Sequence, residues 1–167
     1  MATVIAWLLL PTIGYTDGSY PEGVYSSGWV VADHALYLFF HASVWHLTGN
    51  LFVLWMLRGK LYLVEAFTIA FLMSWLPAVP GVWNMSAAPL CTVGLSGAIF
   101  AIIGIKWGVF CVHRTRGYRT FALKVVPFIL LGAVVPNVNW SLHLYCLLMG
   151  LFVGVVQSLH KKRSYQV

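Results

Sequence analysis

Long apolar stretches separated by short polar segments extend along the chain of 167 residues. A membrane-spanning helix needs about 20 mostly apolar residues, with about 17 to 25 tolerated. Stretches of roughly this kind cover residues 35–57, 61–79, 93–112, 120–135 and 142–159. A sixth stretch, residues 3–14, is shorter and lacks the basic start of a secretory signal, so we expect a short or truncated first span. The pattern predicts an all-α integral membrane protein with six transmembrane helices, in a single domain over residues 1–167.

The composition supports a bilayer environment rather than a soluble globule. Charged residues make up 8% of the chain, against roughly 25% in an ordinary soluble domain, and 60% of the residues are hydrophobic. The net charge of +6 comes from short basic clusters rather than from a continuous basic face, so we expect no nucleic-acid partner. The cysteines Cys91, Cys111 and Cys146 have no paired spacing that would indicate a disulfide or metal framework.

The basic clusters predict how the chain is oriented in the membrane. They follow every second apolar stretch and comprise Arg58, Lys60, Arg114, Arg116, Arg119, Lys161, Lys162 and Arg163. The loops of the opposite side hold Asp17, Glu22 and Asp33 and no Lys or Arg. Because basic loops stay on the cytoplasmic side, we expect a multi-pass protein of the cell (inner) membrane. Both termini then face the cytoplasm if the first stretch spans the bilayer.

Three groups of polar residues lie within or beside the apolar stretches, where their burial in lipid is costly. The first group comprises His41, His46 and Asn50. His46 and Asn50 are four residues apart and share one helix face, whereas His41 points elsewhere or lies in the segment before the helix. Hydrogen bonds between neighbouring helices explain these residues equally well.

The second group is the sequence GLSGA at residues 94–98, which follows a Pro- and Ala-rich loop. It puts Ser96 in the first turn of a helix, where backbone amides and the helix dipole stabilise negative charge. Gly94 and Gly97 let another backbone approach closely. The alternative is a packing motif of small residues in which Ser96 caps the helix. The motif differs from the nucleophile elbow of soluble hydrolases, because Ala98 stands where that motif has glycine.

The third group is His143, near the start of the last apolar stretch and followed by Gly150 and Gly154 in a G-x-x-x-G spacing. Taken alone, this histidine is also explained by a hydrogen bond to a neighbouring helix.

The predicted topology brings the three groups to one depth in the outer half of the membrane. Together they hold the parts for acyl transfer, with Ser96 as nucleophile and His143 as a base within about 2.6–3.2 Å. His46, Asn50 and the Ser96 backbone N–H supply hydrogen-bond donors for the oxyanion. All 4 acidic residues lie in the first loop region or near the cytoplasmic side, so we expect a Ser–His dyad without a third member.

These motifs resemble those of the rhomboid intramembrane serine proteases, in the family's order and over residues 40–154. Residues 41–50 (HASVWHLTGN) resemble the family's H-x4-H-x3-N, and residues 94–98 (GLSGA) resemble its G-x-S-G. Residues 141–150 (SLHLYCLLMG) resemble its H-x-x-G-x-x-x-G ending.

The resemblance implies a rhomboid-like bundle of six transmembrane helices, with Ser96 as nucleophile and His143 as base. It implies an oxyanion site formed by His46, Asn50 and the Ser96 amide, and it puts His41 near the mouth of the site. The implied substrates are transmembrane helices of single-pass membrane proteins, cleaved near the extracytoplasmic face after a small residue. No metal or cofactor is implied.

Several features depart from the family pattern. Cys146 replaces a glycine where the last helix packs against the helix carrying Ser96, which predicts a slightly wider contact. Phe100 stands where a tyrosine commonly supports the catalytic histidine, so ring stacking is expected without the hydroxyl. Glu65 lies about one turn beyond the usual glutamate, and the first loop lacks the arginine of some members. None of these removes the nucleophile, the base or the oxyanion donors, so we expect an active enzyme.

Three alternatives stay open at this point. A rhomboid-like pseudoprotease binds client transmembrane helices without cleaving them, although inactive relatives usually lack the serine or the histidine. A membrane metal or haem protein would use His41, His46 and His143. A rhomboid relative specialised for the C-terminal sorting helices of secreted proteins would be active on a different set of substrates.

Overall fold

The computed structural model describes residues 25–26, 31–41, 43–57, 59–76, 91–113, 117 and 138–164, and positions 120, 121, 123, 125, 126 and 129. Its helices are α2 (Val31–Leu36), the 3-10 helix η1 (Tyr37–Phe39), α3 (Val44–Leu57), α4 (Leu63–Met73), α5 (Ser96–His113) and α7 (Trp140–Ser164). Two short strands, β1 (Tyr25–Ser26) and β2 (Cys91–Thr92), pair antiparallel with Tyr25 opposite Thr92.

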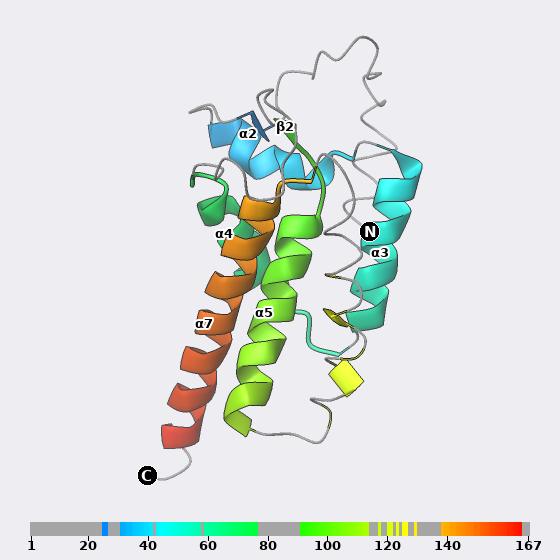
Figure 1. Cartoon of the computed structure of the whole chain (residues 1–167). Helices are drawn as coiled ribbons and strands as arrows, with labels where there is room; N and C mark the ends of the chain where they lie inside the picture. The colour runs from blue at the N-terminus through cyan, green and yellow to red at the C-terminus, as the bar shows by residue number, and fades with distance from the viewer. Residues whose placement is uncertain are drawn as a thin grey trace.

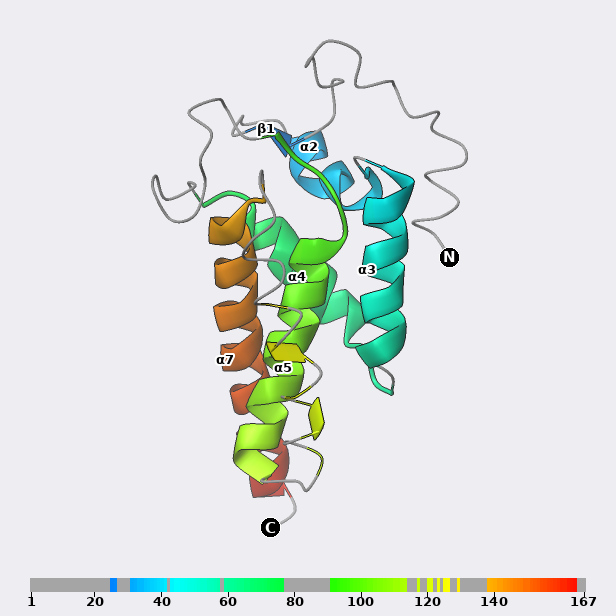
Figure 2. The same cartoon turned by 45° about the vertical axis from the view of Figure 1, so that its right-hand side comes forward.

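Helices α3, α5 and α7 run in the same direction, and α4 runs against them (Figure 1). The amino termini of the three parallel helices therefore meet at one end, which α2 and the strand pair cover (Figure 2). This arrangement confirms that the three predicted polar groups lie at the same end of the bundle.

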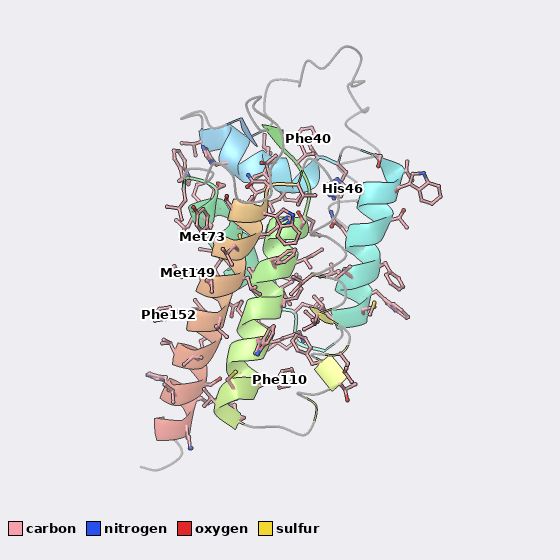
Figure 3. The ribbon with its side chains drawn as sticks, viewed as in Figure 1. Phe40, His46, Met73, Phe110, Met149 and Phe152 are labelled. Atoms are coloured by element: carbon pink, nitrogen blue, oxygen red, sulfur yellow. The ribbon has the colours of Figure 1, made fainter. Side chains whose placement is uncertain are left out.

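Helix α5 forms the centre of the described structure. Its residues from Gly97 to Ile105 are all buried, and it packs against α3, α4 and α7. A helix that is apolar on every side is typical of such a central position. The outer helices expose large apolar side chains, among them Trp55 and Phe152. Met149 and Phe152 lie on the side of α7 that faces away from α5 (Figure 3), as expected for surfaces that meet lipid.

The contact between α5 and α7 is made backbone to backbone through glycines. A Cβ atom at Gly104 would collide with the Leu147 carbonyl oxygen, and one at Gly150 with the Ala101 carbonyl oxygen. Gly108 and Gly154 are surrounded in the same way. Small residues four apart on both helices are typical of close helix packing in membranes. Gly150, which the sequence places in the packing near the site, lies in this contact.

Several predicted spans have different bounds in the structure. The stretch 35–57 is not one helix, because Phe40 is extended after η1 and Ser43 starts α3 by accepting a 3.1 Å hydrogen bond from the His46 N–H. Helix α4 has 11 residues, whereas α7 begins earlier and ends later than residues 142–159 predict. At the described positions between 120 and 129 the backbone is helical, and residues 3–14 lie outside the described part of the chain.

Two of the described helices, Ser96–His113 and Trp140–Lys162, are long and apolar enough to cross a membrane. Helices α3 and α4 are apolar but shorter. The predicted count of six transmembrane helices is therefore not confirmed by the described residues, whereas the all-helical architecture is.

We predict that Gly104→Ala destabilises the protein and that Gly49→Ala does not. A Cβ at Gly104 would lie 2.7 Å from the Leu151 backbone nitrogen, so α5 and α7 must separate. The free energy of unfolding should fall by about 1–3 kcal/mol, as in other overpacked cores. At Gly49 in α3 no atom lies within 4 Å of an added Cβ, and alanine should add about 0.5–1 kcal/mol of helix stability. Thermal unfolding in detergent measures the stability of both variants. Equal shifts of the unfolding temperature in Gly104→Ala and Gly49→Ala would contradict the packing argument.

Candidate active site

Ser96 and His143 lie within hydrogen-bond distance of each other. Ser96 is the first residue of α5, and His143 lies in the first turn of α7. Because the two helices are parallel and packed through glycines, their first turns lie side by side, with 2.8 Å between Ser96 Oγ and His143 Nε2. This distance is within the range that a nucleophile and its base require. The predicted proximity of the two side chains is confirmed.

Two aromatic rings hold the His143 imidazole. The Phe100 ring stacks on it, with 4.3 Å between ring centroids and 8° between planes. The Trp140 ring meets it edge-on at 5.4 Å. His143 is only 7% exposed, and its Nδ1 atom has no hydrogen-bond partner among the described residues. If Nε2 of the neutral imidazole accepts a hydrogen bond from the Ser96 hydroxyl, the single ring proton is on Nδ1.

His46 and Asn50 lie over the backbone just before Ser96. An added Cβ at Gly94 would lie 2.6 Å from His46 Cε1 and 3.3 Å from Asn50 Nδ2, and Gly94 has φ +111°. Figure 3 shows His46 pointing from α3 toward the start of α5. Both the close approach and the backbone conformation therefore require glycine at position 94.

Asn50 carries an unused hydrogen-bond donor. Its side chain is buried, and Nδ2 has no hydrogen-bond partner among the residues that the structure describes. A buried donor without a partner costs about 1–3 kcal/mol. An unpaired buried donor in a native structure therefore needs a specific explanation. One explanation is that a bound molecule brings the missing acceptor.

His41 lies before α3 rather than on it, which settles the alternative that the sequence left open. Its Nε2 atom accepts a hydrogen bond from the Leu95 N–H at 3.4 Å, and Nδ1 lies 3.4 Å from the Phe39 carbonyl oxygen. The ring also meets His46 edge-on at 5.2 Å. His41 thus contacts the loop before Ser96 and the His46 ring, and it does not contact Ser96 through any described hydrogen bond.

Gly97 makes room for two neighbours of the site. An added Cβ there would lie 3.0 Å from Tyr37 Oη and 3.6 Å from Cys146 Sγ. Cys146 is fully buried against α5, and its sulfur sits opposite this glycine. Gly97 on α5 therefore leaves room for Cys146 on α7, which is larger than the glycine of the family pattern.

Trp140 and Tyr37 contact the site and were not predicted from the sequence. Trp140 precedes His143 by three residues, so the helical spacing that puts both on one face was an available signal. Tyr37 accepts the Gly94 N–H through its carbonyl oxygen at 2.8 Å, and its hydroxyl donates to the Ala70 carbonyl at 3.1 Å. Nothing in the sequence indicates those two contacts, because they join segments far apart in the chain.

Among the described residues, no three His, Cys, Asp or Glu side chains are grouped so that they could hold a metal ion. The family model of the Rhomboid domain matches residues 29–160, a range that contains every candidate residue described above. No curated protein matches the chain.

We predict that Gly94→Ala lowers the free energy of unfolding by about 2–4 kcal/mol, from backbone strain and overpacking together. The added methyl must displace the His46 ring and occupy a backbone conformation that alanine disfavours. Gly117→Ala is the matched control, since no atom lies within 4 Å of a Cβ there. Thermal unfolding compares the two, and a Gly94→Ala protein as stable as the control would argue against this geometry.

Proposed function

Because this chain belongs to the rhomboid family of membrane-embedded proteins, we propose that it is an intramembrane serine endopeptidase. Its substrates are transmembrane helices of single-pass membrane proteins, which it cleaves near the extracytoplasmic face. The observation that carries the proposal is the 2.8 Å hydrogen bond between Ser96 Oγ and His143 Nε2. Most members of the family are proteases of this class.

In the proposed reaction His143 acts as base and then as acid. Its Nε2 takes the hydroxyl proton as Ser96 Oγ attacks the substrate carbonyl carbon, and it returns that proton to the leaving amine. The products of this step are an acyl-enzyme and a new amino terminus. Water then attacks the acyl-enzyme, with His143 again accepting the proton, and Ser96 is released with its hydroxyl restored.

The oxyanion that forms during attack accepts hydrogen bonds from Asn50 Nδ2, the His46 ring and the Ser96 backbone N–H. Asn50 supports this role because its donor is buried and has no partner among the described residues. The cost of that unpaired donor is removed only when an acceptor reaches it. An interaction that improves in the transition state accelerates the chemical step rather than tightening ground-state binding.

Packing takes the place of a third catalytic group. In a triad a carboxylate orients the imidazole, whereas here Phe100 stacks on the His143 ring and Trp140 meets it edge-on. Two aromatic contacts restrict the ring without supplying charge. We expect His143 to be oriented well but to gain no electrostatic help as it becomes protonated.

The proposed orientation in the membrane agrees with the position of the basic residues. The connection between α3 and α4 carries Lys60, and the last turns of α7 carry Lys161 and Lys162. Both segments lie away from the start of α5, which carries Ser96, in the direction of the other end of the bundle (Figure 1). Basic residues mark the cytoplasmic side, so the site opens toward the extracytoplasmic side. A substrate helix must unwind there, because a hydrogen-bonded helix hides its carbonyl groups.

A fluorophosphonate probe tests the dyad directly, because only an activated serine attacks its phosphorus. We predict covalent labelling of the detergent-purified protein and its loss in Ser96→Ala and His143→Ala. Ser158→Ala on α7 and His113→Ala at the end of α5 are matched controls that should label normally. A folded wild type that resists the probe would contradict the protease and favour a pseudoprotease that binds client helices.

Asn50→Ala should separate catalysis from stability. We predict that kcat for a transmembrane peptide in vesicles falls by about 10²–10³-fold, the usual loss for one oxyanion donor, with KM nearly unchanged. Thermal stability should hold or rise, since the substitution removes a buried unpaired donor. Thr48→Ala, at an exposed position of the same helix, is the control. A parallel loss of stability and activity in Asn50→Ala would assign the residue to the fold instead.

A further inference from the structure

Asn139 uses both ends of its side-chain amide. Its Oδ1 atom accepts a 3.0 Å hydrogen bond from the Leu142 N–H, which caps the start of α7. Its Nδ2 atom donates to Thr92 Oγ1 at 2.8 Å. The orientation of the amide follows from its partners, because a backbone N–H only donates and must face the oxygen.

This hydrogen bond joins the segments that lead to the two dyad residues. Thr92 belongs to β2 and precedes Ser96 by four residues, and Asn139 precedes His143 by four. Asn139 is itself tied to His143 through the first turn of α7, because the His143 N–H donates to the Asn139 carbonyl oxygen at 3.2 Å. Thr92 is 7% exposed, so the bond lies largely out of water.

The glycine contacts lie further along the helices than the dyad. Gly104 follows Ser96 by eight residues and Gly150 follows His143 by seven, about two helical turns in each case. They hold the helix axes together two turns away from the dyad. Nearer the dyad the first turns meet through side chains, with Cys146 packed opposite Gly97 and the Phe100 ring stacked on His143. Since His143 Nδ1 has no partner among the described residues, no described hydrogen bond to that nitrogen holds the ring.

We infer that Asn139 and Thr92 are positioning residues, whose hydrogen bond keeps Ser96 Oγ and His143 Nε2 within reach of each other. This role rests on the proposed function, because it concerns the alignment of the dyad for attack. Asn139 also caps α7, and a test must separate that structural task from the tether to Thr92.

Substitutions at the two positions make that separation. Thr92→Val removes the tether and leaves the cap intact, and Thr92→Ser keeps the hydroxyl. Asn139→Ser retains a capping oxygen but is too short to reach Thr92, whereas Asn139→Ala loses both functions. Thr68→Val, at an exposed position of α4, makes the same chemical change as Thr92→Val away from the site.

The measurements are the rate of fluorophosphonate labelling and the kcat and KM for a transmembrane peptide, at a temperature where every variant is folded. Thr92→Val and Asn139→Ser should each lower the labelling rate and kcat roughly tenfold with KM unchanged. That is less than the roughly 100-fold loss that a 1 Å misplacement can cause, because the glycine contacts remain. The double variant should be no slower than either single one, and Thr92→Ser should restore the rate.

The outcomes separate the two proposals. A wild type that is not labelled overturns the protease and the positioning role with it. A labelled wild type, with Thr92→Val and Asn139→Ser reacting at the wild-type rate, overturns only the positioning role. If the variants unfold at a lower temperature but are labelled at the wild-type rate while folded, the hydrogen bond between Asn139 and Thr92 stabilises the fold and does not position the dyad.

Discussion

Helices α5 and α7 touch backbone to backbone, and the geometry around Ser96 depends on that contact. Gly104 and Gly150 each face a carbonyl oxygen of the other helix so closely that even a methyl group would collide. Apolar side chains gain little from leaving lipid for another helix, so close packing and weak polar contacts between backbones must hold such helices together. Two parallel helices packed this tightly present their first turns side by side, and these turns carry Ser96 and His143, which share a hydrogen bond.

Polar groups concentrate at the end of the bundle where those turns begin. The loop before Ser96 cannot form helical hydrogen bonds, and its amides are bound individually, Gly94 by the Tyr37 carbonyl and Leu95 by His41. Irregular backbone at membrane depth is tolerated only where protein or a wet cavity satisfies it. Tyr37 in η1 and His41 after it therefore stabilise the loop. Asn50 Nδ2 lies buried beside this loop and has no hydrogen-bond partner among the described residues, which supports its proposed role as a donor to the oxyanion.

The departures from the family pattern are accommodated by packing. Cys146 is larger than glycine, but its sulfur faces Gly97, whose missing side chain leaves room for it. Phe100 has no hydroxyl, yet its ring still stacks on His143 as expected, because stacking needs only the aromatic face. Both departures therefore keep the packing around His143 and Ser96.

The sequence alone determined the membrane class, the helical architecture, the Ser–His pair and the groups around it, because apolar length and residue type are local properties. The start of α3 was predicted wrongly from the sequence. The extended Phe40 and the cap at Ser43 interrupt the helix, but they leave the hydropathy of the apolar stretch unchanged. The stacking of Phe100 on the imidazole was expected from the sequence, whereas only the tertiary structure decided the edge-on contact of Trp140 and which loop amides are bound. Those contacts, like the bond between Asn139 and Thr92 across 47 residues, depend on how helix ends meet in space. The G-x-x-x-G spacing in the sequence indicates that the last helix packs closely, but it does not say which residues of the two helix starts come together.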